Sequence, residues 1–257
     1  MAIVPAAAQT LAILQLLSAQ AGPVPAAVIV RSLGLPRSTV YHLLSTLVDS
    51  GFVTHLPEDR RYALGIAAYE LGTGYTRQAP LQRLARVPLA ELVDRTGHTA
   101  HLAVQHGREV VYVIEERAPG QPPLVTDVGV RLPAQLTASG RALLAALPAA
   151  QIRALFPDAA TFVLRTPVGP RSPTALRALL TDVRRRGYAI EDGEVSAGWA
   201  SVASAVFDHS GHPVASVAVT FPSVSTPAPA RARMAVVTLR TADTLTRRIG
   251  GVVPDRP

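Results

Sequence analysis

Six polar side chains between residues 37 and 45 are of the types that contact nucleic acid: Arg37, Ser38, Thr39, Tyr41, His42 and Ser45. Four of them, at positions 38, 41, 42 and 45, recur at the spacing of one helical face. Hydroxyl groups and an aromatic ring suit base edges in a major groove, and an arginine at the start of the helix suits a phosphate. The stretch therefore predicts DNA recognition, although an ordinary surface helix would show the same pattern.

A second group of residues could in principle do acid/base chemistry. Glu191, Asp192 and Glu194 lie close together in the sequence, but no G-x-S-x-G motif, glycine-rich phosphate loop or spaced nucleophile and base accompanies them. The chain has no cysteine, which excludes disulfides and thiolate sites. His98 and His101 are placed to point to opposite faces of a strand, so we expect no metal site, no cofactor and no catalytic residue.

The DNA-reading residues need a helix that buries its other side. Apolar residues at positions 40, 43, 44, 47 and 48 predict such a helix over residues 36–50. We expect two preceding helices, over residues 10–19 and 25–33, with Gly34 in the turn. After Gly51, strands at residues 52–54 and 61–64 form a wing, with Arg60 and Arg61 at its tip, where they could touch phosphates.

Composition and charge are compatible with this reading but do not establish it. A hydrophobic fraction of 48% and a charged fraction of 17% describe a folded protein, and 257 residues favour two domains. The formal net charge is +7, yet residues 1–78 have five arginines and four acids, so the DNA-reading segment is barely basic. No run approaches the roughly 18 apolar residues that cross a bilayer and no signal peptide begins the chain, so we expect a cytoplasmic protein with no membrane partner.

Several blocks together resemble the IclR family of bacterial transcription regulators. These are GLPRSTVYHLLSTLVDSGFV, RYALGIAAYELG, ELVDRTGHTAHLAVQHGREVVYVIE, VGVRLPAQLTASGRALLA, LRALLTDVRRRGYAIEDGE and ASVASAVFDHSGHPVASVAVTF, in the family's order. The resemblance covers residues 11–245. It implies an α+β protein in which an N-terminal winged helix-turn-helix domain (residues 1–64) is joined by a linker helix (65–79) to a C-terminal GAF-like effector-binding and oligomerisation domain (80–257).

Beyond the linker, the pattern predicts the elements of this second domain. Helices are expected over residues 80–96, 137–147, from 148, over 174–186 and over 228–249. Strands are expected over residues 101–105, 109–115, 188–190, 201–207 and 213–221, with a further short strand at 124–128.

The resemblance also implies a pocket for a small organic acid and assigns residues to it. They are Ala138 and Ser139 at a helix N-terminus, where N–H groups receive a carboxylate, then Glu191 or Asp192, Ser201, Ala218 and Thr220. Family members often have Cys at the position of Ser201 and Ser at that of Ala218. These departures predict a less polar pocket, suited to an aromatic or longer acid, while Trp199 is expected to pack in a core or interface.

The function that follows is a ligand-responsive regulator on a pseudo-palindromic operator in double-stranded DNA. One winged helix makes few base contacts, so we expect a homodimer, or the tetramer common in the family. An effector would shift DNA binding by a coupling of about 1–3 kcal/mol. Two alternatives stay open: a DNA-binding dimer that has lost its ligand, and an enzyme acting on a small carboxylate.

Overall fold

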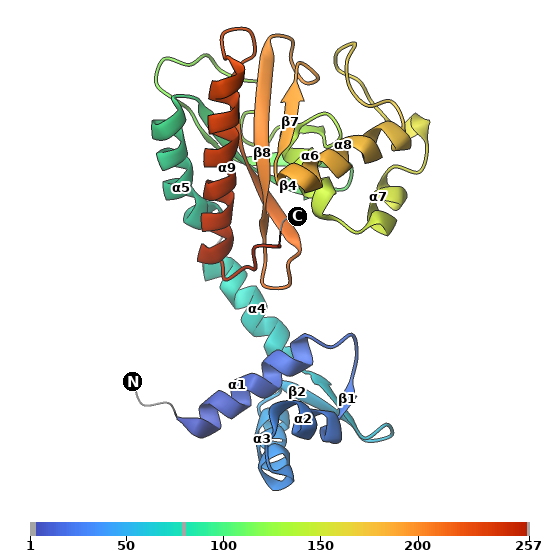
Figure 1. The fold of residues 1–257 in the computed structure, drawn as a ribbon. Coiled ribbons are helices and arrows are strands. Elements are labelled where there is room, and N and C mark those ends of the chain that lie inside the picture. The colour runs from blue at the N-terminus through green and yellow to red at the C-terminus, as the bar shows by residue number, and fades with distance from the viewer. Residues whose placement is uncertain (1–3, 79–80, 256–257) are drawn as a thin grey trace. The chain divides into compact units, whose positions relative to one another are not determined.

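The computed structural model describes residues 4–78 and 81–255 (Figure 1). The chain separates into two compact units, Met1–Pro80 and Leu81–Pro257, each with its own core. This is the α+β class that the sequence predicts, with a helix-turn-helix unit followed by a mixed helix and sheet unit. Among the described residues, no helix is both long and apolar enough to cross a membrane.

The N-terminal unit contains three helices, a small sheet and a fourth helix. The elements are α1 (Pro5–Ser18), β1 (Val24–Pro25), α2 (Ala26–Leu33), α3 (Arg37–Asp49), β2 (Val53–Leu56), β3 (Arg61–Leu64) and α4 (Ile66–Gln78). The sheet is antiparallel in the order β1-β3-β2. The wing is thus confirmed, and β1 adds a two-residue strand that the sequence does not predict.

Burial of one face of α3 explains why this segment is a helix. Val40, Leu44 and Leu47 are buried against Ile13 of α1 and Ile29 of α2. These are the positions that the apolar periodicity predicts. Because the opposite face of α3 has no partner in this unit, its polar side chains stay in solvent.

Gly65 joins the wing to α4 at a place where no side chain fits. A Cβ at this position would lie 2.2 Å from the carbonyl oxygen of Gly51. The close approach lets the Gly65 N–H donate to the carbonyl of Phe52 at 2.8 Å. Glycine is therefore required by backbone packing here.

The C-terminal unit is built on one antiparallel sheet of six strands in the order β6-β5-β4-β9-β8-β7. The strands are β4 (Thr99–His106), β5 (Glu109–Glu116), β6 (Arg131–Pro133), β7 (Ala189–Asp192), β8 (Trp199–Phe207) and β9 (Pro213–Pro222). The helices are α5 (Leu81–Thr96), α6 (Ala138–Ala146), α7 (Ala149–Leu155), α8 (Pro173–Arg186) and α9 (Ala228–Arg248), with a short 3₁₀ turn at Ala159–Thr161.

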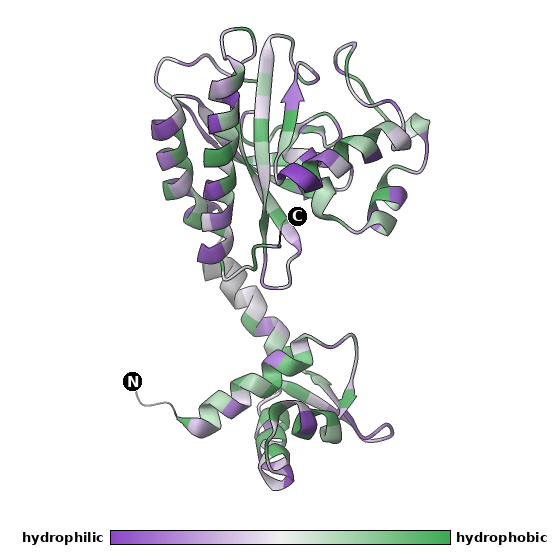
Figure 2. Ribbon diagram, in the orientation of Figure 1, coloured by the Kyte–Doolittle hydropathy of each residue, from purple (hydrophilic) through white to green (hydrophobic). Residues whose placement is uncertain are grey.

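Helices cover both faces of this sheet. α5 and α9 lie on one face and α6 with α8 on the other, and a separate apolar core fills each side (Figure 1). Figure 2 shows hydrophilic and hydrophobic residues in alternating bands around α5, α8 and α9. That banding is the amphipathic pattern expected of helices that each bury one side on a sheet.

One predicted strand and several predicted boundaries are wrong, among them the starts of β4 at Thr99 and β8 at Trp199, each two residues earlier than expected. α1 begins at Pro5 instead of residue 10, because proline at the first helical position needs no N–H partner and alanines follow it. α8 is capped by Ser172, whose Oγ accepts the Ala175 N–H at 3.2 Å. Residues 124–128 form a loop, and the strand beside β5 is instead β6, at Arg131–Pro133.

Candidate functional site

The exposed face of α3 carries the residues that the sequence assigns to DNA. Arg37, Ser38, Tyr41, His42 and Ser45 are exposed, and Thr39 is half-buried. The exposed fraction of Tyr41 is 42%, which is high for a large aromatic side chain. A single helical surface therefore presents a cation, hydroxyls, an imidazole and an aromatic ring to solvent.

Arg37 and Tyr41 support each other one turn apart on α3. The guanidinium carbon of Arg37 lies 5.6 Å from the centre of the Tyr41 ring. This cation–π contact places the Arg37 guanidinium beside the Tyr41 ring near the helix N-terminus, where phosphates are favoured. Arg37 has no ion-pair partner among the described residues, so its charge is available to an external anion.

The two wing arginines have different surroundings. Arg60 lies at the exposed tip in a left-handed backbone conformation with φ of 50°. Arg61 opens β3 and donates from Nη1 to the carbonyl of Pro23 at 3.1 Å, so its guanidinium is tied to the segment that enters β1. The structure thus leaves Arg60 at the tip and gives Arg61 an internal contact that the sequence does not predict.

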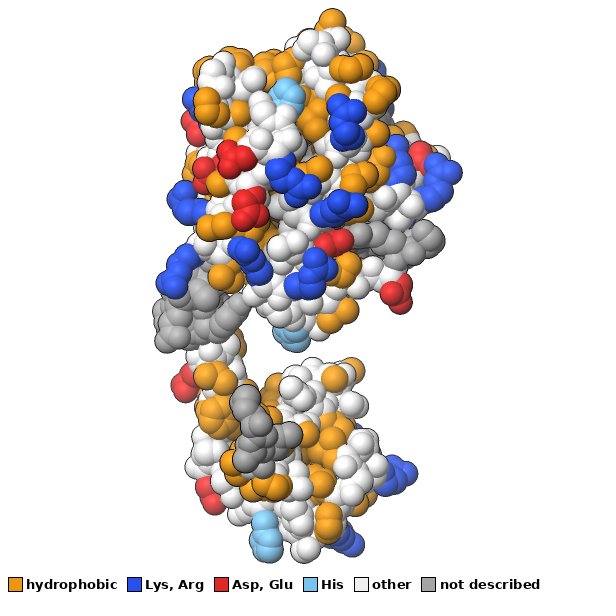
Figure 3. Space-filling view, turned by 60° about the vertical axis from the view of Figure 1, so that its left-hand side comes forward, with side chains coloured by type: hydrophobic (Ala, Val, Ile, Leu, Met, Phe, Trp, Pro, Cys, Tyr) orange, Lys and Arg blue, Asp and Glu red, His pale blue; other side chains and the backbone are white. Residues whose placement is uncertain are grey.

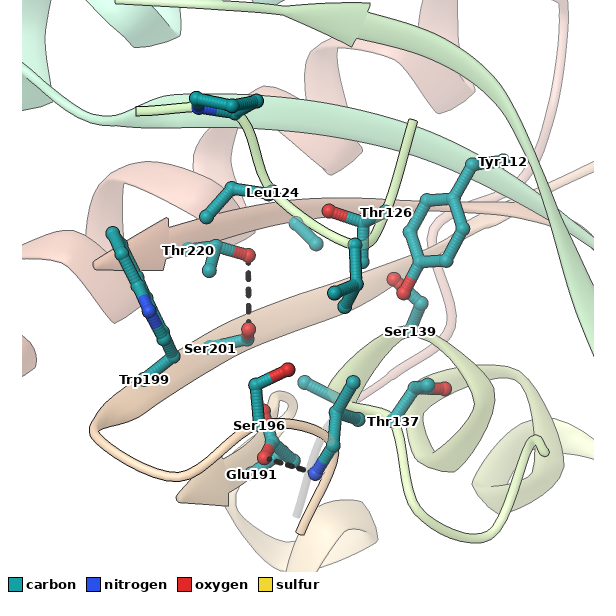
Figure 4. Close-up of a pocket in the computed structure, with 15 residues that line it drawn as sticks. Tyr112, Leu124, Thr126, Thr137, Ser139, Glu191, Ser196, Trp199, Ser201 and Thr220 are labelled. Atoms are coloured by element: carbon teal, nitrogen blue, oxygen red, sulfur yellow. Dashed lines mark hydrogen bonds between the residues drawn. The ribbon is translucent and has the colours of Figure 1, made fainter. Parts of the chain in front are cut away.

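The second candidate site is a cavity of about 80 Å³ on the α6 face of the sheet in the C-terminal unit (Figure 4). Six of the seven residues predicted for the effector line it: Ala138, Ser139, Glu191, Ser201, Ala218 and Thr220. The remaining lining residues are Tyr112, Pro123, Leu124, Val125, Thr126, Thr137, Val195, Ser196 and Trp199. The fold therefore brings together positions that lie more than one hundred residues apart.

The N-terminal turn of α6 faces this cavity with unused donors. Thr137 is the cap and its Oγ1 accepts the Gly140 N–H at 2.9 Å. The N–H groups of Ala138 and Ser139 have no acceptor among the described residues, as expected for the first turn of a helix. The Ser139 hydroxyl is also buried, at 1% exposure, and makes no hydrogen bond of normal geometry, although the Tyr112 phenol lies close enough for the two groups to interact. A buried group of this kind is costly unless a bound molecule satisfies it.

Glu191 is the acidic residue of the cavity. Its exposed fraction is 3%, and its Oε1 accepts the Val195 N–H at 3.0 Å. Burial, aided by the charge of the nearby Glu194, raises the pKa of Glu191 to about 7 against the lowering effects of the Val195 N–H and Arg141. Near neutral pH this carboxyl group therefore exists in both protonation states.

Asp192, the other acidic residue predicted for the effector, points away from the cavity. Its carboxylate accepts from Ser223 Oγ at 2.5 Å and from Arg231 Nη1 at 2.7 Å. Burial favours a higher pKa, but these two partners outweigh it and hold the pKa of Asp192 below its ordinary value. Successive side chains on β7 alternate between faces, so only one of the two acids can enter the cavity, and that one is Glu191.

A buried arginine holds the framework around Glu191. Arg141 of α6 is 2% exposed and donates to the carbonyls of Gln135 and Ile190 and to Glu194 Oε1, each at 2.8 Å. Glu194 Oε2 in turn accepts the N–H of Asp192 at 2.6 Å. These contacts tie α6 to β7 and to the segment that follows it.

The far wall of the cavity comes from β8 and β9. Ser201 and Thr220 are paired in register, and their hydroxyl oxygens lie 2.9 Å apart (Figure 4). Ala218 lies beside them. The predicted packing role of Trp199 is incomplete, because the half-buried indole also lines the cavity at the start of β8.

Several lining residues have no counterpart in the sequence prediction. Tyr112 is 4% exposed, and burial raises the pKa of its phenol well above the ordinary value. The alternation of β5, in which Val110, Tyr112 and Ile114 are buried, is a signal that identifies it as an inward polar group. Thr126 and Ser196 lie in loops, where no periodicity reveals the direction of a side chain.

The described residues contain no group of three or more His, Cys, Asp or Glu side chains that could hold a metal ion. His101 is fully buried on β4, and burial lowers its pKa to about 3.

Cationic side chains gather over one face of the C-terminal unit among acidic ones (Figure 3).

Known proteins show the same two parts in the same order. The IclR helix-turn-helix domain matches residues 6–57, and the C-terminal domain of the bacterial transcriptional regulator IclR matches residues 73–247. The HTH-type transcriptional regulator XynR of Escherichia coli is 32% identical over 86% of this chain and 87% of that protein. The Glycerol operon regulatory protein of Streptomyces coelicolor is 34% identical over 75% of this chain and 74% of that protein.

Solved structures agree with these matches. IclR of Thermotoga maritima is 26% identical, with a TM-score of 0.63 over 96% of this chain and 99% of that one. An IclR transcriptional regulator from Silicibacter sp. TM1040 is also 26% identical, with a TM-score of 0.68 over 97% of both chains. With its winged helix-turn-helix, its six-stranded sheet and matches to both family domains, the chain belongs to the IclR family of DNA-binding bacterial transcription regulators.

Proposed function

We propose that the protein is an effector-responsive regulator in which α3 reads an operator and the cavity beside α6 binds a small organic acid. The observation that carries the effector part is the first turn of α6. There, two free N–H groups and the buried Ser139 hydroxyl, whose polar neighbour is the Tyr112 phenol, converge on one cavity. Helix N-termini favour anions because their N–H groups and macrodipole both present partial positive charge.

The ligand's carboxylate accepts hydrogen bonds from the N–H groups of Ala138 and Ser139. Glu191 contributes a second polar contact as long as it is protonated, since a carboxylic acid can donate to an oxygen of the ligand. An ionised Glu191 would repel the ligand's charge instead. Binding of an acid therefore raises the pKa of Glu191 beyond about 7, and affinity falls as the pH rises through that value.

The size of the cavity favours a compact acid over the aromatic or longer one that the sequence suggests. A volume of about 80 Å³ is small beside the several hundred Å³ of typical drug-sized ligand sites. The apolar wall, which includes Leu124, Val125 and Ala218, accommodates a short carbon chain. Ser201 and Thr220 already bond to each other, so a ligand group must compete with that contact.

That occupied contact and the apolar Ala218 also favour a second candidate, a DNA-binding dimer without an effector. The two candidates differ in one observable. Only the effector-responsive protein is stabilised, or altered in its DNA binding, by a compact acid.

The regulator acts on DNA as a homodimer or a higher assembly. Large apolar side chains are exposed on α1 and α4, with exposed fractions of 59% at Leu11, 67% at Ile66, 70% at Tyr69 and 66% at Leu71. Such side chains are typical of an interface. A symmetric dimer presents two copies of α3 to two half-sites, which matches the symmetry of a pseudo-palindromic operator. We place this dimer in the cytoplasm, where the DNA lies.

DNA binding is tested by mobility shift on the DNA upstream of the protein's own gene and of adjacent genes. Arg37→Ala and Tyr41→Ala should each weaken binding about tenfold or more, since contacts of this kind contribute roughly 1–3 kcal/mol. Arg177→Ala is the matched control, because it removes an exposed arginine of α8, outside the N-terminal unit. A loss with Arg177→Ala as large as that with Arg37→Ala would reduce the arginine effect to net charge.

The effector is tested with the same DNA and a panel of compact and aromatic acids. A compact acid that changes operator affinity for the wild type and not for Ser139→Ala supports the proposed pocket. Failure of every acid to alter the melting temperature or DNA binding would favour the ligand-independent dimer.

A further inference from the structure

The loop between β5 and β6 covers the effector cavity and is weakly attached to the sheet. Residues 123–126 of this loop supply four of the lining side chains. Apart from turn bonds from Gln121 to Ala118 and from Val130 to Asp127, its backbone is anchored at its end, where Gly129 donates to the carbonyl of Tyr112 at 2.8 Å. Val125 and Val128 are 46% and 58% exposed, so they add little packing.

One side-chain contact joins this loop to the sheet. His101 Nε2 lies 2.8 Å from Thr126 Oγ1, and the two side chains are 0% and 7% exposed. Within the part of the chain that the structure describes, no other hydrogen bond links residues 119–128 to the sheet.

His101 is well placed to hold that contact. It lies on β4 in register with Ala218 of β9, so both side chains project to the face of the sheet that bears the cavity. Its ring meets the ring of Tyr112 edge to face at 5.3 Å between centroids. Burial, reinforced by Arg117 against the opposing effect of Asp127, lowers the pKa of His101, so the imidazole is neutral.

The neutral imidazole has one protonated nitrogen, and the other ring nitrogen, Nδ1, has no partner. In the tautomer with the proton on Nε2, the Nε2–H donates to Thr126 Oγ1, and Nδ1 is an acceptor whose lone pair receives no hydrogen bond. If Thr126 moved away, His101 would be left buried without any partner. The loop is thereby held closed by the cost of an unsatisfied buried group.

We propose that residues 119–128 form a lid over the effector cavity and that the His101–Thr126 hydrogen bond is its latch, which makes His101 a positioning residue that limits the size of the acid bound. This proposal rests on the effector site proposed above. With the latch closed, the cavity keeps its compact volume. With the latch broken, the wall formed by residues 123–126 can retreat and admit a bulkier acid.

The latch is tested without any ligand by hydrogen–deuterium exchange of the full chain. Thr126→Val keeps the shape of the side chain and removes the hydroxyl, so exchange within residues 119–128 should rise roughly fivefold. Thr126→Ser restores a hydroxyl and should return exchange toward the wild-type rate. Thr238→Val is the control, since this threonine is buried like Thr126 but its hydroxyl has no partner to lose.

The size limit is tested by thermal shift with pyruvate as the compact probe and benzoate as the bulky one. Thr126→Val should increase the shift with benzoate relative to that with pyruvate, a change that mere loss of stability would not produce. Unchanged exchange in residues 119–128 of Thr126→Val overturns the latch. If neither acid shifts any variant, the effector site fails, and the exchange result still decides whether the latch exists.

Discussion

Replacing Glu191 by Gln should stabilise the protein at alkaline pH and change little at acid pH. Burial raises the pKa of Glu191 to about 7 from its ordinary value of 4.5. The folded protein prefers the protonated carboxyl of Glu191. The contribution of this group to the unfolding free energy is therefore fully present below its pKa in the unfolded chain. That contribution is lost as the pH rises through about 7, when the buried group must ionise.

The size of the effect follows from the two pKa values. A difference of two to three units, at 1.36 kcal/mol per unit, makes ionised Glu191 cost about 3 kcal/mol of unfolding free energy above pH 7. Glutamine retains an oxygen that can accept the Val195 N–H but never ionises. For a unit of this size, the gain corresponds to a melting temperature higher by about 5–10 °C at pH 8.

The assay is thermal unfolding of the wild type and Glu191→Gln, without ligand, at pH 5, 6, 7 and 8. The difference in melting temperature should grow across this range. Glu91→Gln, which removes an exposed carboxyl from α5, should show no such growth. A Glu191→Gln difference that is constant with pH would refute the reasoning, because it would mean that the buried carboxyl does not titrate in this range.

Three further outcomes follow from other contacts. Arg141→Met should lower the unfolding free energy by about 3–5 kcal/mol, because Glu194 loses its partner at a largely buried ion pair. A denaturant titration measures this loss, and near-wild-type stability would show that solvent replaces the guanidinium. Gly65→Ala should lower the melting temperature of the N-terminal unit, since its Cβ would meet the Gly51 carbonyl; an unchanged melt would show that the backbone relaxes at no cost. Tyr69→Glu should shift sedimentation toward the monomer, and an unchanged assembly would move the interface away from α4.

Local patterns in the sequence predict most of the elements correctly. The apolar period of α3 identifies both its buried residues and its exposed polar face, because both follow from a helical repeat. The wing follows from a turn between two short strands. Small residues followed by an apolar run predict α6. In the structure, Thr137 caps this helix by accepting the Gly140 N–H.

Positions that depend on distant parts of the chain were less predictable. The strand expected at residues 124–128 fails because its valines find no partner, while β6 takes the edge of β5. The resemblance to the family left Glu191 and Asp192 undecided. Their separation depends on Ser223 and Arg231, which are more than thirty residues away in the sequence.

The sequence by itself determined the order of the two domains and the exposed polar face of α3, because periodicity and ordered motifs are properties of the chain. The resemblance to the family supplied six of the residues around the cavity. Only the tertiary structure decided which acid lines the cavity, that Tyr112 and Trp199 also line it, and that His101 contacts Thr126 in its wall. The reason is physical. Burial, pKa and hydrogen-bond partnership depend on what the rest of the fold packs around a residue, and no local pattern specifies those neighbours.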